Sequence, residues 1–149
     1  PLKDTIADDT PVREAALFGI HGGHVNVTDG RYVYMRAWPG EENTPLYNYT
    51  LMPTHMTAIF SVEELQQATL APPFSFTKGM PLLKIPAGFW RTKYPFETML
   101  FDLEADPEQK TPIDAPDVEA RMIEHMVTLM KWNDSPDEQY ERLGLTAPA

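Results

Sequence analysis

Residues 24–36 constrain the fold more than any other segment, because they carry the pattern of a β-hairpin. Two runs of alternating apolar and polar residues flank the pair Asp29-Gly30. Asp-Gly between such runs is typical of a two-residue turn in which the glycine takes a positive φ. We therefore predict that Val27 faces Tyr32 across the hairpin. The side chains expected to share one face of this pair are Val25, Val27, Tyr32 and Tyr34.

Apolar periodicity and turn residues elsewhere predict further strands and helices. Ser61 and Glu64 form a capping box that begins a short helix over residues 62–69. A longer helix over residues 117–132 carries apolar side chains at three- and four-residue intervals, and Ser135 begins a last short helix. Further strands, the first of them buried, are expected over residues 15–20, 46–51, 82–85 and 98–103. The fold class expected for the single domain 1–149 is α+β, a small antiparallel sheet of about four strands with a C-terminal helix packed on one face.

The charge of the chain argues against several classes of partner. Its net charge of −10 opposes binding to nucleic acid and to anionic membranes, and no apolar run approaches the ~20 residues of a membrane span. Residues 65–96 nevertheless contain no acidic side chain, so this segment can face an anion. The chain has no cysteine, so thiols give no information on its compartment, and we expect a soluble protein of the cytoplasm or the periplasm.

Three segments of the chain resemble one known family. They are Ala16-Leu17-Phe18-Gly19, the hairpin at residues 24–36, and Met99-Leu100-Phe101-Asp102-Leu103-Glu104-Ala105-Asp106-Pro107-Glu108. Together they resemble the C-terminal subdomain of bacterial type I sulfatases, which are arylsulfatase-like enzymes of the alkaline phosphatase superfamily. In that family a "gryKyi"-like strand is followed, some distance on, by an "LYDLexDPxE" segment. The resemblance implies that residues 1–149 are the C-terminal part of a sulfuric ester hydrolase whose catalytic domain lies upstream.

The resemblance also implies that the catalytic centre lies outside this chain. Family members use a formylglycine made from Cys or Ser in a Cys/Ser-x-Pro/Ala-x-Arg motif, with a divalent cation, typically calcium, held by Asp and Asn. Cysteine is absent, and none of Ser61, Ser75 and Ser135 begins that motif. We therefore expect no catalytic residue, no cofactor and no metal site in this chain, and no activity from it alone.

Two histidines around a glycine pair form the first candidate binding segment. His21 and His24 flank Gly22-Gly23. Zinc needs three or four converging ligands, and two histidines at this spacing do not match a recognised zinc motif. We interpret both imidazoles as substrate-binding candidates that line a cleft or bind backbone carbonyls. The neighbouring Asn26-Val27-Thr28 matches a glycosylation sequon but lies in an expected strand, so we assign it no role.

An aromatic and basic segment supplies the other substrate-binding candidates, Lys78, Arg91 and Lys93. The aromatic residues around them are Phe74, Phe76, Phe89, Trp90 and Tyr94. Such a mixture can stack on a sugar or aryl ring and hold an anion. Two interpretations stay open: the segment forms one wall of a substrate pocket, or its aromatic side chains pack in the core while the cations are solvated.

The resemblance implies two partners in the full enzyme, the upstream catalytic domain and a sulfate-ester substrate. The loops around residues 21–24 and 74–94 would line the mouth of the substrate site. Separated from the catalytic domain, the chain is expected to expose apolar surface and to self-associate. One alternative is a stand-alone carbohydrate- or anion-binding module that uses the aromatic and basic segment, and another is an independent metal enzyme that uses the histidines.

Overall fold

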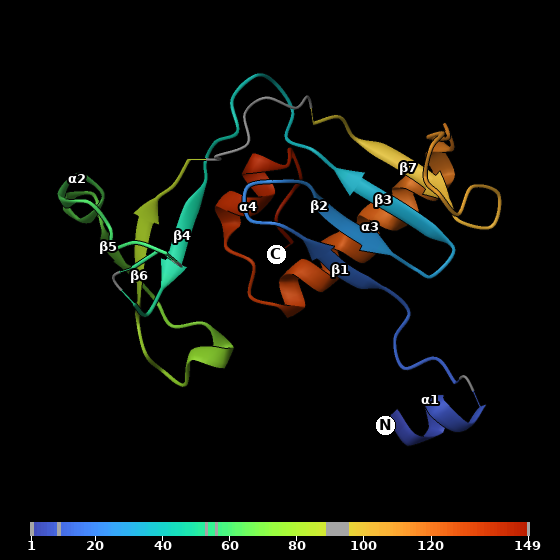
Figure 1. The fold of residues 1–149 in the computed structure, drawn as a ribbon, viewed down its shortest axis with the longest axis horizontal. Coiled ribbons are helices and arrows are strands. Elements are labelled where there is room, and N and C mark those ends of the chain that lie inside the picture. Colours follow the sequence, from blue (N-terminus) through green and yellow to red (C-terminus); the bar gives the residue numbers. More distant parts are fainter. Residues whose placement is uncertain (1, 9, 53, 56, 89–95, 149) are drawn as a thin grey trace. The chain divides into compact units, whose positions relative to one another are not determined.

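The computed structural model describes residues 2–8, 10–52, 54–55, 57–88 and 96–148. The chain divides into two compact units, the first formed by residues 1–37 and 96–132 and the second by residues 38–95 and 133–149. Among the described residues, seven strands form two antiparallel sheets, one in each unit (Figure 1). Because helices accompany both sheets, the expected α+β class is confirmed.

The first unit is built on a four-stranded antiparallel sheet. Its strands are β1 (Ala16–Gly19), β2 (Val25–Thr28), β3 (Tyr32–Arg36) and β7 (Met99–Asp102), in the order β1-β2-β3-β7. The first three follow one another along the chain, whereas β7 pairs with β3 after the long segment that belongs to the second unit. The expected burial of the first strand is wrong. Because β1 is an edge strand, Phe18 remains 48% exposed.

The predicted hairpin forms between β2 and β3, but its register differs from the prediction by two residues. Val27 pairs with Tyr34 rather than with Tyr32. The strand pair nearest the loop is Thr28 with Val33, and the backbone N–H of Asp29 also donates to the carbonyl of Tyr32 at 3.4 Å. Residues 29–31 therefore separate the two strands, one residue more than predicted. A shift of two residues preserves the alternation of side chains, which keeps the predicted residues on one face.

The side chain of Asp29 explains the wider loop. Its Oδ1 accepts hydrogen bonds from the backbone N–H groups of Arg31, at 3.0 Å, and Tyr32, at 2.7 Å. An aspartate that binds the backbone two residues further on replaces part of the hydrogen bonding of a tight turn. Gly30 has the predicted positive φ, at 96°. Sequence patterning therefore located the turn correctly but not its length.

The long helix α3 (Pro116–Trp132) packs on one face of the first sheet, against β1 and β2 (Figure 1). Its buried side chains Met122, Met126 and Met130 are at most 2% exposed. Burial of each such side chain contributes roughly 1.5–3 kcal/mol. Tyr34 is fully buried, and its hydroxyl donates to Oε1 of Glu119 on α3 at 2.9 Å. The predicted helix on one face of a sheet is confirmed.

The second unit contains a three-stranded sheet of β4 (Tyr47–Thr50), β5 (Thr69–Ala71) and β6 (Leu82–Pro86), in the order β4-β6-β5. The strand expected over residues 46–51 therefore belongs to this sheet and not to that of the hairpin. The unit also holds a 3₁₀ helix (Ser75–Thr77) and α4 (Asp137–Arg142). The expected cap of α4 is wrong, because its N-cap is Pro136 and not Ser135.

The helix α2 (Val62–Gln66) begins as predicted. Ser61 Oγ accepts from the backbone N–H of Glu64 at 3.2 Å, and the Glu64 carboxylate accepts from the backbone N–H of Ser61 at 2.7 Å. The helix ends before the predicted residue 69, because Thr69 pairs with Lys84 in the sheet. One further short helix, α1 (Leu2–Asp8), precedes β1. None of the described helices is both long enough and apolar enough to cross a membrane.

Substituting Gly30 tests the conformation of the hairpin loop. Gly30 has a φ of 96°, and a Cβ added there would meet no atom within 4 Å beyond its chain neighbours, so Gly30→Val should destabilise through backbone strain alone. We expect a loss of about 1–2 kcal/mol in the free energy of unfolding. Gly88→Val is the matched control, because that position is equally open but has no positive φ. Urea unfolding of both variants measures the difference, and equal losses would contradict the described loop.

Candidate functional site

The loop that carries the two candidate histidines connects β1 to β2 in the first unit. The backbone N–H of Gly23 donates to the carbonyl of Ile20 at 3.0 Å, which closes a tight turn directly after β1. His21 is exposed on this turn, whereas His24 is half-buried at the start of β2. The structure therefore separates the two candidates, and only His24 lies against the sheet.

His24 borders an open recess of about 440 Å³, which we call the β1–β2 recess. Its lining residues are Phe18, Gly19, Ile20, His24, Asn26, Met35 and Phe96. Across the strands, Phe18 pairs with Asn26, and Asn26 pairs with Met35, so these three side chains form one row. Their sequence neighbours Val27 and Tyr34 point to the opposite face, on which Tyr34 binds α3. The recess therefore lies on the sheet face turned away from α3.

The hydrogen bond of His24 determines which ring nitrogen carries a proton. Nε2 lies 2.8 Å from the carbonyl oxygen of Glu97. Because a carbonyl can only accept, Nε2 must donate its hydrogen there. The imidazole also lies 4.8 Å from the Phe96 ring, centroid to centroid. His24 thus contributes an oriented ring to the wall of the recess, and it binds a backbone carbonyl as the sequence predicted.

Asn26 is the polar centre of the recess, and the sequence pattern did not predict it. Its side chain is among the few buried polar groups, with 6% of the residue exposed. Among the described residues, no donor forms a hydrogen bond with its Oδ1, although this atom is fully buried. Gly19 lies beside it, and a Cβ on that glycine would lie 2.6 Å from the His24 carbonyl oxygen and 3.8 Å from Asn26 Nδ2. The glycine therefore allows β1 to approach His24 closely.

The structure assigns none of the basic candidates to the described lining residues of this recess. Lys78 belongs to the second unit, where it ends the 3₁₀ helix with a φ of 54° and is exposed. Arg91 and Lys93 lie outside the described residues. In the same unit the Phe74 ring packs 5.2 Å from Tyr49 and 5.5 Å from Phe76, and Phe76 is 68% exposed.

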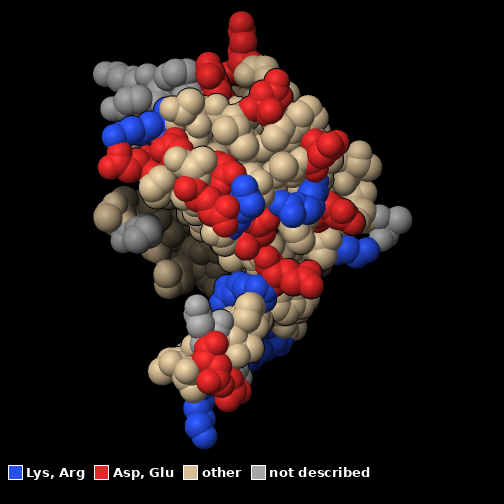
Figure 2. Space-filling model, turned by 90° about the vertical axis from the view of Figure 1, so that its right-hand side faces the viewer, with Lys and Arg blue, Asp and Glu red and all other residues tan. Residues whose placement is uncertain are grey.

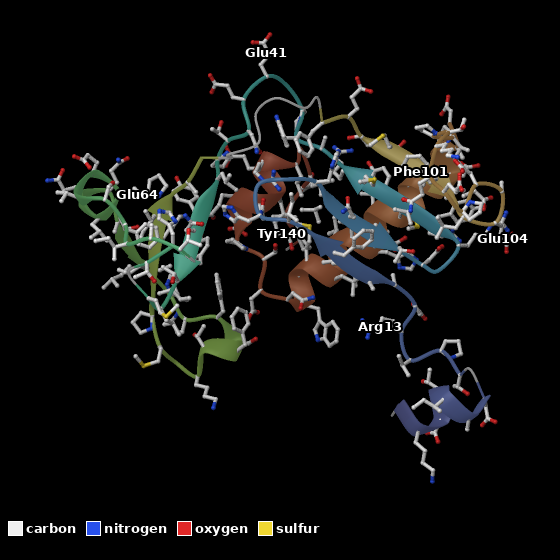
Figure 3. All side chains as sticks on the ribbon, in the orientation of Figure 1. Arg13, Glu41, Glu64, Phe101, Glu104 and Tyr140 are labelled. Carbon is white, nitrogen blue, oxygen red and sulfur yellow. The ribbon has the colours of Figure 1, made fainter. Side chains whose placement is uncertain are left out.

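Two arginines of the first unit pair with neighbouring carboxylates. Arg31 forms a bidentate pair with Asp102, at 3.3 Å from Nε to Oδ1 and 2.9 Å from Nη2 to Oδ2. This pair raises the pKa of Arg31 and lowers the pKa of Asp102. Glu104, labelled in Figure 3 beyond β7, lies 3.2 Å from the same guanidinium. Arg121 on α3 likewise pairs with Asp29 at 3.0 Å.

The distribution of charged side chains on the surface agrees with these arginine–carboxylate pairs. On the face drawn in Figure 2, most basic side chains lie beside acidic ones instead of forming a separate basic patch. Among the described residues, no group of three or more His, Cys, Asp or Glu side chains is arranged to hold a metal ion. None of the described lining residues of the β1–β2 recess is a lysine, arginine, aspartate or glutamate.

A second polar cluster joins α4 to the sheet of the second unit. The carboxylate of Glu138 contacts Lys84 Nζ and accepts a hydrogen bond from the Tyr49 hydroxyl. Lys84 Nζ also lies 4.2 Å from the centroid of the Tyr47 ring. Burial and the bond to Glu138 raise the pKa of Tyr49 to about 12. Burial alone would raise the pKa of Glu138, but the bonds from Lys84 and Tyr49 outweigh it and lower that pKa.

Comparison with known proteins gives no relative for this chain. No family model matches it, and no curated protein or solved structure matches it significantly.

Neutralising Glu138 tests the second cluster. Because the pKa of Glu138 is lower in the folded state, its ionised form stabilises the fold above the ordinary glutamate pKa, and this stabilisation is lost as the pH falls through the lowered value. Glu138→Gln should cost about 1 kcal/mol at neutral pH after allowance for solvent screening. The difference from the parent should shrink toward zero below about pH 4.

Glu141→Gln provides the control, because Glu141 lies exposed on the same helix. Thermal unfolding of parent and variants across the pH range gives the measurement. A Glu138→Gln effect that persists unchanged at acidic pH would show that the ionised carboxylate is not responsible.

Proposed function

We propose that this chain is the non-catalytic C-terminal part of a sulfatase-like hydrolase, which completes the fold of the enzyme and lines the mouth of its substrate site. The observation that carries the proposal is the arrangement of the three segments that resemble the family. They become β1, the β2–β3 hairpin and β7, and these strands make up the whole four-stranded sheet of the first unit. Three segments, one of them far from the other two in the chain, thus form a single sheet.

A specific contact between two of these segments adds support. The bidentate pair of Arg31 and Asp102 joins the hairpin loop to the end of β7. Planar bidentate pairs need both partners in one geometry, so the two residues depend on each other. Asp106, in the same downstream segment, accepts from the backbone N–H groups of Lys110, at 2.6 Å, and Thr111, at 2.7 Å. The residue types that carry the resemblance therefore have defined structural roles.

The β1–β2 recess supports a role for this unit in contacting the organic part of a substrate. Its described lining residues include no lysine or arginine that would bind a sulfate group. In the proposed enzyme, the upstream catalytic domain supplies the formylglycine, the calcium ligands and the groups that hold the sulfate. His24 and the apolar residues of the recess would then face the remainder of the ester. Arg91 and Lys93 stay candidates for anion contacts.

One observation favours the alternative of a carbohydrate- or anion-binding module. In the second unit, Phe76 is 68% exposed two residues before Lys78, on a turn whose other aromatic residue packs against Tyr49. An exposed ring close to a cation can stack on a sugar. This module would bind ligand without any partner domain, which distinguishes it from the proposed enzyme part.

The coding sequence upstream of this chain tests the main proposal directly. We expect a Cys/Ser-x-Pro/Ala-x-Arg motif in frame, and no turnover of 4-nitrophenyl sulfate by residues 1–149 alone with calcium, because nucleophile and cation ligands would lie upstream. In the full-length protein, His24→Ala should raise KM several-fold with little change in kcat. His55→Ala is the control, since His55 pairs with Glu64 in the second unit.

Three outcomes would overturn the proposal. An upstream reading frame without the motif would remove the catalytic domain that it requires. Turnover by the isolated chain would place a catalytic centre within these residues. An equal effect of His24→Ala and His55→Ala on KM would remove the assignment of the β1–β2 recess to the substrate site.

The proposal also predicts self-association of the isolated chain. Large apolar side chains of the second unit are strongly exposed, among them Ile59 at 80% and Leu70 at 75%. Exposed apolar surface of this kind promotes contacts between copies. Static light scattering over a concentration series should therefore give an average mass above 16.9 kDa that rises with concentration. A constant monomeric mass up to millimolar concentration would favour the stand-alone module.

A further inference from the structure

We propose that a second recess of the first unit binds a small organic ligand that carries one anionic group, and that Arg13, Arg121 and His125 hold this group. The recess lies between the segment before β1, the hairpin loop and α3, and we call it the α3 recess. It shares no described lining residue with the β1–β2 recess, so the inference goes beyond the proposed function.

The α3 recess brings together three basic side chains from two parts of the chain. Arg13, labelled in Figure 3, lies on the segment that leads into β1. Arg121 and His125 lie four residues apart on α3, so they share one face of the helix. The recess measures about 620 Å³, and its lining residues are Pro11, Val12, Arg13, Glu14, Asp29, Arg121 and His125. Basic side chains distant in the sequence therefore line one open recess.

Arg121 is already oriented by the protein and keeps donors for a ligand. Its Nη2 donates to Oδ2 of Asp29 at 3.0 Å, and its guanidinium carbon lies 5.4 Å from the centroid of the Tyr32 ring. A guanidinium has five N–H donors, and among the described residues no other hydrogen bond engages this one. Because a carboxylate and a ring hold Arg121 in place, it loses little side-chain entropy when an anion binds to its remaining donors.

Arg13 and His125 are not paired in this way. Among the described residues, neither side chain forms a hydrogen bond or an ion pair. Arg13 is exposed, and His125 is half-buried. Both therefore have N–H groups that can bind an oxyanion beside the oriented guanidinium of Arg121.

The carboxylate of Asp29, although it lines the recess, is already satisfied by the protein. Its Oδ1 accepts from the backbone N–H groups of Arg31 and Tyr32, and its Oδ2 accepts from Arg121. Hydrogen bonds from N–H groups and from a guanidinium compensate the charge of a carboxylate. Asp29 therefore serves to position Arg121, and it opposes an incoming anion less than a free carboxylate would.

The charge of the ligand follows from the lining residues that remain. Glu14 is exposed and forms no hydrogen bond or ion pair with a described residue, so solvent screens it. With Asp29 and Arg121 paired, the other charges are those of Arg13, Glu14 and a protonated His125. Their sum is positive when the imidazole carries a second proton, so binding is measured at about pH 6, where histidines gain protons.

The size of the recess and its apolar lining define the rest of the ligand. Binding sites for small molecules usually measure about 300–1,000 Å³, so 620 Å³ leaves room for more than an isolated inorganic ion. Pro11 and Val12, the latter 52% exposed, offer apolar surface to an organic body. Because the whole chain carries a net charge of −10, it repels polyanions. The expected ligand is therefore a sulfate ester, a phosphate ester or a carboxylate with one small organic group.

The experiment is an NMR titration of the ¹⁵N-labelled chain, residues 1–149. The probes are benzenesulfonate, phenylphosphonate and benzoate, which share one ring and differ in the anionic group, and benzyl alcohol is the neutral control. We expect the anions to cause saturating shifts at the Nε–H of Arg121 and at the backbone amides of residues 12–14, with a dissociation constant on the order of 1 mM. Benzyl alcohol should bind at least about 5-fold more weakly, because it lacks the charge. The tightest of the three anions identifies the class of the ligand.

Substitutions that remove one basic group test the assigned residues. Arg13→Gln and His125→Gln should each weaken binding of the anions by about 3- to 10-fold. Lys110→Gln is the matched control, because Lys110 is an equally exposed cation of the first unit that does not line the recess. It should change the affinity by less than about 2-fold, since salt screens distant charges. Arg121→Gln is not used, because it would also break the pair with Asp29.

Glu14→Gln distinguishes an anion site from a cation site. The substitution removes the carboxylate that opposes the ligand, so binding of the anions should tighten by about 2- to 3-fold. Arg13 and Glu14 are both exposed, so their variants should keep the melting temperature of the parent. These two variants, which change affinity in opposite directions, therefore decide the test even if His125→Gln alters the fold.

Several results would overturn the inference. They are the absence of saturating shifts with any of the anions at about 10 mM, benzyl alcohol binding as tightly as the anions, and equal effects of Arg13→Gln and Lys110→Gln. Weaker binding of the anions by Glu14→Gln would also overturn it, because the carboxylate would then contribute to binding. None of these results bears on the upstream motif, which tests the proposed function separately.

Discussion

The pairing of β3 with β7 is the contact on which the first unit depends. Tyr34 pairs with Leu100 across a long intervening segment, and both side chains are almost fully buried. The entropy cost of closing such a loop grows only slowly with its length, so burial of a few apolar side chains can offset it. At one end of the pair Arg31 binds Asp102, and at the other the backbone N–H of Ala37 donates to Thr98 at 3.2 Å. Without this pairing, the segments before and after the second unit would not form one sheet.

Local patterns predicted most elements of the fold, whereas sheet membership and loop length depended on contacts beyond those patterns. The stripe on α3 and the capping box of α2 follow from residues three or four apart, and both are confirmed. The hairpin register failed because the Asp29 carboxylate binds two backbone amides, an interaction that an Asp-Gly pair does not specify. The strand at residues 46–51 was assigned to the wrong sheet, because alternation in one strand does not identify its neighbour.

In the candidate site, too, the sequence predicted some residues, whereas others became evident only from contacts between strands. His24 was identified from its sequence context, and the structure places it at a recess, but its partner residue His21 lies apart from that recess on an exposed turn. Asn26 was missed because one polar residue between two valines resembles any half-exposed strand position. The structure shows that Asn26 is 6% exposed and that it stands in one row with Phe18 and Met35 across three strands. None of the described lining residues of this recess is a lysine, arginine, aspartate or glutamate.

The three segments with a family resemblance form one sheet, and its register places Phe18, Asn26 and Met35 in one row. Both the proposed function and the recess depend on this register, which a NOESY spectrum of the labelled chain can verify. We expect cross-strand NOEs between Tyr34 and Leu100, and between the Asn26 and Met35 positions. Cross-strand NOEs between Val27 and Tyr32, or the absence of any NOE between β3 and β7, would contradict it.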